Sequence, residues 1–305
     1  MSKTTTTFAV IITAISTCFI AQPASAQGRF DEVEIKTTKL TDSVYMLVGA
    51  GGNIGLSVGE DGAFMIDDQF AELSEKILAA VAEITDKPIK FLVNTHHHGD
   101  HTGGNKNIGK TGTIIVAHEN VRKRLTKDQF IKVFNSTTPA SSGAALPVVT
   151  FTKDITLHIN SDKVHIFHVD PAHTDGDSLV HFKKANVLHM GDIFFNGMYP
   201  FIDVSSGGSI DGMIKAAERG IKLSDDKTKI IPGHGPLATK QNLDGYHKML
   251  IAARDLIKPL VEQGKSRDEV IAAKPTATLD EVWGKGFMKP DVWVGIVYDG
   301  MVKEE

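Results

Sequence analysis

A short histidine-rich stretch in the N-terminal half constrains this chain more than any other feature. Residues 94–104 have the sequence NTHHHGDHTGG, and within it an H-x-H-x-D-H motif is formed by His96, His98, Asp100 and His101. The apolar run at residues 89–93 predicts a short buried strand just before the motif. Imidazole and carboxylate groups suit zinc, at roughly 2.0–2.2 Å. Because alternate side chains of an extended segment point the same way, we expect Asp100 to share a face with His96 and His98, and His101 to turn away. One loop would then supply two adjacent metals.

Composition narrows the class of partner. The chain has 305 residues, 41% of them hydrophobic, which is ordinary for a globular protein with a sizeable core. Its formal net charge is −4 and its pI is near 6.4, with no block of basic residues. Phosphate binding needs clustered Lys and Arg, so we expect a small-molecule substrate and no nucleic acid. The oligomeric state is left open.

The N-terminus has the pattern of an export signal. Lys3 precedes an apolar run over residues 8–21, and Ala24-Ser25-Ala26 follows. This predicts a signal peptide over residues 1–26, cleaved after Ala26, and a secreted or periplasmic protein with no stable membrane insertion afterwards. An uncleaved membrane anchor is the alternative. The single cysteine, Cys18, lies in this segment, so any metal ligand in a mature chain of residues 27–305 must be His, Asp or Glu.

The remainder predicts one domain whose halves share an organisation of strands, helices and a strand that ends in candidate ligands. Residues 49–53 are expected to form a mobile inter-strand loop, and residues 127–149 lose periodicity and predict a surface insertion. Residues 33–47 have a strand-like pattern with a turn near residues 41–43, and further strands are expected at residues 54–58, 63–66, 89–93, 113–117, 155–159, 163–169, 178–182, 186–190 and 230–231. The expected helices are at residues 71–84, 119–125, 209–223, 241–261, 266–273 and about 292–302.

Three more candidate ligands follow predicted strands. His173 lies in PAHTDGD, Asp192 in HMGD and His234 in PGHG. Each signal is weak alone, because Asp and His are common at strand ends. Together with the first motif they indicate one concave site at a rim of the sheets.

These motifs resemble the metallo-β-lactamase fold superfamily. The resemblance runs from about Val44 to Gly235 and includes Asp67 in FMID. It implies an α/β fold, the four-layered αβ/βα sandwich, with two zinc ions at the edge between two sheets. By the same resemblance His96, His98 and His173 would bind one zinc, and Asp100, His101 and His234 the second. Asp192 would bridge the two ions, Asp67 would orient the metal loop, and His97 and His189 would have no ligand role.

The resemblance implies a dinuclear zinc hydrolase, in which a metal-bridged hydroxide attacks an amide, ester, thioester or lactone, and the N-terminal pattern adds the expectation that it is exported. Asp100 would bind zinc, orient the nucleophile and carry its proton. Weak β-lactamase activity is a hypothesis motivated by the expected fold and export, whereas Asp192, which stands where subclass B1 enzymes have cysteine, argues against strong hydrolysis of β-lactams. Two alternatives stay open: a mononuclear iron enzyme similar to persulfide dioxygenases, and a non-catalytic metal-binding protein.

Overall fold

The computed structural model describes Met1 and residues 28–302. The predicted signal peptide and its cleavage site lie outside the described residues. The contacts divide the chain at Glu32, and the description below concerns the unit that begins at Val33. Of the helices that the structure describes, none combines the length and the apolar character needed to cross a membrane.

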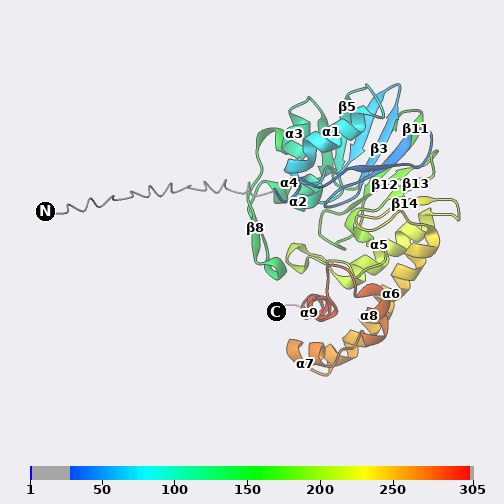
Figure 1. The fold of residues 1–305 in the computed structure, drawn as a ribbon. Coiled ribbons are helices and arrows are strands. Elements are labelled where there is room, and N and C mark those ends of the chain that lie inside the picture. Colours follow the sequence, from blue (N-terminus) through cyan, green and yellow to red (C-terminus); the bar gives the residue numbers. More distant parts are fainter. Residues whose placement is uncertain (2–27, 303–305) are drawn as a thin grey trace. The chain divides into compact units, whose positions relative to one another are not determined.

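The first sheet has seven strands in the order β1-β2-β3-β4-β5-β6-β9 (Figure 1). Its strands are β1 (Lys36–Lys39), β2 (Val44–Val48), β3 (Ile54–Gly59), β4 (Gly62–Ile66), β5 (Ile89–Asn94), β6 (Ile114–His118) and β9 (Val149–Phe151). Pairing is antiparallel from β1 to β4 and parallel from β4 through β5 and β6 to β9. The carboxyl ends of the parallel strands therefore meet at one edge.

The second sheet has five strands in the order β10-β11-β12-β13-β14. These are β10 (Asp154–Ile159), β11 (Asp162–His168), β12 (Ser178–Phe182), β13 (Val187–His189) and β14 (Lys229–Ile231). Pairing is antiparallel except between β13 and β14, which run parallel.

Helices cover the outer faces of the two sheets, so the layers run helix, sheet, sheet, helix (Figure 1). In the figure α1 and α3 lie on the first sheet, and α5 and α6 lie on the second. The α-helices are α1 (Ser74–Ala82), α2 (Gly99–Thr102), α3 (Asn105–Gly109), α4 (Glu119–Leu125), α5 (Ile210–Leu223), α6 (Lys240–Glu262), α7 (Arg267–Ala272), α8 (Ala277–Trp283) and α9 (Pro290–Met301). The 3-10 helices are η1 (Ala71–Leu73), η2 (Lys132–Phe134), η3 (Gly143–Ala145), η4 (Gly191–Ile193) and η5 (Val204–Ser206).

Strands that are buried on both faces explain the nearly continuous apolar runs in the sequence. Phe64 of β4 packs edge-on against Phe182 of β12, with ring centroids 5.8 Å apart, between the two sheets. Their neighbours along the strands point the other way, and Leu179 and Leu188 pack in the cluster that includes α5, α6 and α9. The α/β fold and its four-layered αβ/βα arrangement agree with the prediction from the sequence.

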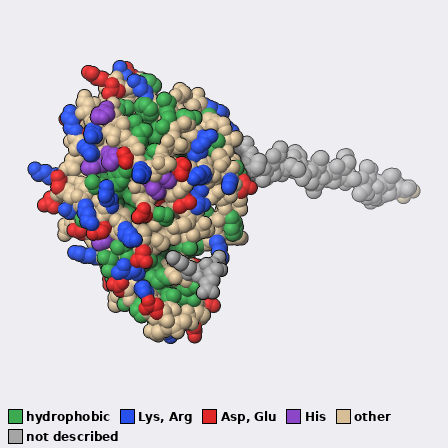
Figure 2. Space-filling model, turned by 180° about the vertical axis from the view of Figure 1, so that it is seen from behind, with side chains coloured by type: hydrophobic (Ala, Val, Ile, Leu, Met, Phe, Trp, Pro, Cys, Tyr) green, Lys and Arg blue, Asp and Glu red, His purple; other side chains and the backbone are tan. Residues whose placement is uncertain are grey.

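Charges of both signs are mixed on the face shown in Figure 2, where Lys and Arg side chains alternate with Asp and Glu. The picture shows this face alone. On it, basic side chains form no continuous stripe.

Two local predictions were wrong. β5 ends at Asn94 and α2 begins at Gly99, so the H-x-H-x-D-H motif is not one extended segment, and Asp100 groups with His101 and His234 instead of sharing a face with His96 and His98. α8 lies in a stretch where no helix was expected. Most of the 127–149 region is exposed, as a surface insertion would be, and it contains the two-stranded hairpin of β7 (Gln129–Ile131) and β8 (Ser136–Thr138).

The loop over residues 49–53 also differs from the expected mobile connection. Asn53 is buried, and its side-chain amide donates to the carbonyls of Pro232 and Gly235, both at 2.9 Å. Gly52 N donates to Asp100 O at 3.0 Å. The loop is therefore tied to two segments that carry candidate ligands.

Candidate metal centre

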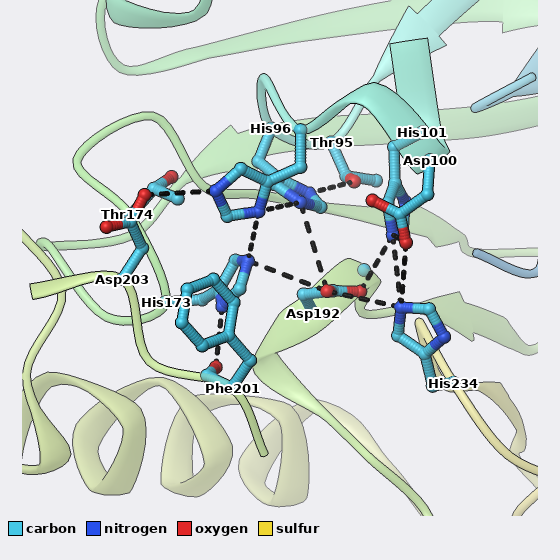
Figure 3. Close-up of polar contacts among 12 residues, drawn as sticks. Thr95, His96, Asp100, His101, His173, Thr174, Asp192, Phe201, Asp203 and His234 are labelled. Atoms are coloured by element: carbon cyan, nitrogen blue, oxygen red, sulfur yellow. Dashed lines mark hydrogen bonds and ion pairs between the residues drawn. The ribbon is translucent and has the colours of Figure 1, made fainter. Parts of the chain in front are cut away.

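Three imidazoles form the first group of candidate ligands. His96 and His98 follow β5, and His173 precedes β12. Figure 3 shows His96 and His173 close together. His98 Nδ1 lies 3.1 Å from His96 Nε2 and 2.9 Å from His173 Nε2. All three side chains are buried.

A second group lies beside the first. Asp100 and His101 come from α2, and His234 follows β14. His234 Nε2 lies 3.3 Å from Asp100 Oδ2 and 3.4 Å from His101 Nε2. This group is more open to solvent, since the Asp100 side chain is 27% exposed.

Asp192, in η4 after β13, lies between the two groups (Figure 3). Its Oδ2 is 3.5 Å from His173 Nε2 and 3.3 Å from His234 Nε2. Its Oδ1 is 3.0 Å from His101 Nε2. One carboxylate thus faces both sets of imidazoles.

Acceptors on the far side of each ring decide which imidazole nitrogen faces the centre. His173 Nδ1 donates to Phe201 O at 2.8 Å, and His98 Nε2 to Asp203 Oδ2 at 3.0 Å. His101 Nδ1 donates to Asp67 Oδ2 at 2.8 Å. A carbonyl or carboxylate can only accept, so in His98 and His173 the proton sits on the outer nitrogen and the inner nitrogen keeps its lone pair. Burial disfavours charge on His101, but the carboxylates of Asp192, Asp100 and Asp67 outweigh it and raise the pKa of that imidazole well above its usual value.

His96 is oriented through a relay. Its Nδ1 lies 3.1 Å from Thr95 Oγ1, and that hydroxyl donates to Asp67 Oδ2 at 2.7 Å. The hydroxyl proton is used, so Thr95 accepts from His96. The inner nitrogens of His96, His98 and His173 thus converge at about 3 Å from one another, and a bound cation would relieve the repulsion between their lone pairs. The residues present fit a metal of the zinc type.

Charge differs between the two groups. Burial lowers the pKa of His173 to about 4 and that of His96 well below its usual value, so both are neutral at pH 7. Burial also disfavours charge on His234, but the carboxylates of Asp192 and Asp100 outweigh it and raise the pKa to about 9. For Asp100, burial raises the pKa, but His101 and His234 outweigh burial and lower it to about 2. In the second group, a charged imidazole is therefore paired with ionised carboxylates at pH 7.

Two glycines allow the backbone to approach the candidate ligands. A Cβ on Gly52 would lie 2.1 Å from His101 Cε1, and a Cβ on Gly233 would lie 2.0 Å from Asp192 Oδ1. Both distances are far inside van der Waals contact. Glycine at these positions lets His101 and Asp192 reach the centre.

All seven candidate ligands predicted from the sequence lie at this centre, and Asp67 contacts it through Thr95 and His101. Asp67 has φ of +60°, a left-handed conformation that costs a non-glycine residue about 1–2 kcal/mol. Its three hydrogen bonds to Thr95 and His101 offset that cost.

The sequence analysis did not predict roles for Asp203, Thr95 or the Phe201 carbonyl, which orient ligands; Thr95 lies inside the histidine-rich stretch, but Asp203 and Phe201 lie outside the ligand motifs. Asp203 follows the apolar Phe201-Ile202 pair, a weak signal for a buried carboxylate. Of the two histidines without an expected ligand role, His189 bonds to Asn53 O at 3.0 Å. His97 is buried, and neither ring nitrogen has a hydrogen-bond partner among the described residues.

Comparison with known proteins gives a family. Residues 48–234 match the model of the metallo-beta-lactamase superfamily. A hydroxyacylglutathione hydrolase of Pelagibacter ubique is 28% identical over 156 residues, which are 50% of this chain and 54% of that protein. This chain thus spans about half the length of that relative.

Solved structures share the fold. A metallo-beta-lactamase from Pontibacter korlensis superimposes with a TM-score of 0.59 at 19% identity, over 71% of this chain and 99% of the other. The sec-alkylsulfatase Pisa1 from Pseudomonas sp. gives a TM-score of 0.69 at 15% identity, over 89% of this chain and 51% of the other. At these identities the likeness concerns the fold alone. From the match of residues 48–234, which carries the candidate ligands, the chain belongs to the metallo-beta-lactamase superfamily.

Proposed function

We propose that this protein is an exported dinuclear zinc hydrolase that cleaves an amide, ester, thioester or lactone. The observation that carries the proposal is the position of Asp192, whose carboxylate lies within 3.5 Å of His173, His101 and His234. A carboxylate shared by two ligand groups suits two adjacent cations, because its negative charge would help to neutralise both of them.

The residues would divide the work as follows. His96, His98 and His173 would hold one ion, Asp100, His101 and His234 the second, and Asp192 both. Bound zinc would lower the pKa of a shared water toward about 7 and polarise the scissile carbonyl. The Asp100 side chain is partly exposed beside His234, so it would orient the attacking water and accept its proton.

The substrate class follows from the chemistry and from the relatives. Hydroxyacylglutathione, in the name of the Pelagibacter relative, is a thioester, so thioesters are the first substrates to test. Export and fold motivate the further hypothesis of β-lactamase activity. Nitrocefin turnover that is no faster than that of an Asp100→Asn variant would remove it.

Metal analysis of the native protein separates this proposal from a mononuclear iron enzyme. We expect two zinc ions per chain, since the second group is complete and lies against Asp192. Zinc-loaded protein should hydrolyse at least one member of a panel of lactams, lactones, thioesters and phosphodiesters, and Asp192→Asn should lose metal and activity together. A single iron per chain, with no hydrolysis, would contradict the proposal. The N-terminal sequence of protein from a periplasmic fraction tests export and cleavage after Ala26.

A further inference from the structure

Beside the first ligand group lies an exposed phenylalanine. Phe134 ends η2, at the tip of the hairpin formed by β7 and β8, and it is 46% exposed. Its ring centroid is 5.0 Å from that of Phe201. The Phe201 ring in turn lies 5.6 Å from His98 and 5.7 Å from His173. Phe134 thus extends an aromatic surface outward from the candidate ligands.

A second exposed phenylalanine lies beside the other group. Phe287, between α8 and α9, is 50% exposed. Its ring centroid is 6.2 Å from that of His234 and 6.0 Å from that of Phe195, which itself stacks on His234 at 5.0 Å.

The segment that carries Phe287 is anchored on both sides of it. A Cβ on Gly286 would lie 2.6 Å from Met198 Cβ, so the backbone there packs closely on Met198. Met288 is 2% exposed. The ring is therefore held at the surface by packed neighbours and does not project from a free loop.

Isolated exposed apolar residues are ordinary and need no explanation. Here two such rings come from segments far apart in the sequence, and each contacts an inner phenylalanine that touches a candidate ligand. Each ring leaves about half its surface in water, which is the surface that an apolar substrate group could cover.

The basic side chains near the first ligand group offer a substrate less than the two rings do. Arg124 lines a small depression next to His97 and His98, but its guanidinium is paired with both Asp175 oxygens, at 2.6 and 2.8 Å. Its charge is therefore already neutralised. Lys127 lies at the same depression and supplies the electrostatic alternative that the experiment must test.

We propose that Phe134 and Phe287 form two apolar subsites, one beside each ligand group, which select substrates with aliphatic or aromatic groups on both sides of the scissile bond. The inference rests on the proposed hydrolase and deepens it. Each ring would contribute about tenfold to affinity for a substrate that covers it.

Binding without turnover tests the subsites directly. The probes are acetate and 4-phenylbutanoate, two carboxylates that differ in apolar length, titrated calorimetrically into zinc-loaded protein. We expect 4-phenylbutanoate to bind more tightly than acetate. Phe134→Ala or Phe287→Ala should weaken the binding of 4-phenylbutanoate about tenfold and leave the binding of acetate unchanged. The carboxylate would lie at the metal centre, so the single apolar tail can cover only one of the two rings, and the affected variant shows which. If neither variant shows this effect, the proposal fails, and a ring whose alanine variant changes neither this affinity nor the hexanoate-to-acetate ratio of kcat/KM described below is not a subsite.

The controls separate the subsites from general damage. Phe130→Ala alters a 54% exposed ring on the same hairpin and should change neither affinity. Phe134→Leu should keep most of the affinity. Equal losses for both probes, or a loss in Lys127→Ala alone, would overturn the proposal.

Turnover of 4-nitrophenyl acetate and 4-nitrophenyl hexanoate distinguishes failure of the subsites from failure of the function. If chain-length-dependent binding needs the rings but neither these esters nor any member of the substrate panel is cleaved, the hydrolase proposal fails and the subsites stand. If both esters are cleaved equally well and neither alanine variant changes the ratio of kcat/KM values, the function stands and the subsites fail.

Discussion

Asp203 Oδ2 lies 3.0 Å from His98 Nε2, on the side of the imidazole opposite the nitrogen that faces His96 and His173. Both side chains are buried. Burial raises the pKa of Asp203, but the hydrogen bond from His98 outweighs burial and holds the pKa below its usual value. A permanent carboxylate thus keeps the His98 proton on Nε2 and leaves Nδ1 free for a metal.

Asp203→Ala should therefore weaken metal binding by the first group by about 10–100-fold, since the ring loses the acceptor that fixes its tautomer and orientation. Asp203→Asn should have a smaller effect. Competition with a chromophoric chelator measures the affinity. Asp226→Ala, at an exposed carboxylate, is the matched control. Wild-type metal affinity in Asp203→Ala would show that the contact is incidental.

Removal of metal should lower thermal stability. Without a cation, the converging imidazole lone pairs repel one another, and so do the carboxylates of Asp100 and Asp192. A ligand that binds only the folded protein adds about 2.7 kcal/mol to the free energy of unfolding when it is present at 100 times its Kd. For a chain of this size we expect chelation to lower Tm by at least about 5 °C, measured by circular dichroism. Added zinc should restore the Tm in wild type but only partly in Asp192→Asn. Identical melting curves with and without chelator would contradict this.

Gly233→Ala should displace Asp192. The added Cβ would lie 2.0 Å from Asp192 Oδ1, so the carboxylate must move out of its shared position. We expect loss of at least one metal per chain and a fall in activity of more than tenfold. Gly245→Ala, in α6 with no neighbour within 4 Å of the new Cβ, is the control. It should keep both metals and gain up to about 1 kcal/mol of stability from helix propensity. Equal metal content in the two variants would refute the steric argument.

The stacked pair of His118 and His168 should make stability depend on pH. Their rings lie 3.8 Å apart with an interplanar angle of 6°, and burial, followed by the His168 charge, lowers the pKa of His118. A histidine whose pKa is lower in the folded protein favours folding fully above its unfolded pKa of about 6.5, and this contribution is lost as pH falls.

His168→Leu should therefore reduce the loss of stability between about pH 7 and pH 5, because one of the two repelling charges is gone. Urea unfolding at each pH measures the effect, with His158→Gln, at an exposed ring, as the control. An unchanged pH slope in His168→Leu would show that the pair does not couple.

The sequence predicted the strands that end at the site because those strands are buried on both faces and therefore appear as apolar runs. Val93 of β5 and Ile231 of β14 are examples, each followed closely by candidate ligands. Periodicity failed where local contacts decide the structure. The turn into α2 at Gly99 places Asp100 with His101, and no alternation rule for an extended segment predicts that turn.

By itself, the sequence determined the residue types at the centre, their order along the chain and most of the strands and helices, because ligand chemistry and hydrophobic patterning are local properties; the layered α/β architecture was expected only from the resemblance of the motifs to a known superfamily. The tertiary structure alone decided that Asp192 faces both ligand groups, that Asp203 orients His98 from 105 positions away, and that Phe134 and Phe287 flank the centre. Those relationships depend on which loops come into contact when the two sheets pack together. Contacts between residues far apart in the sequence are set by tertiary packing, which leaves no periodic signal in the chain.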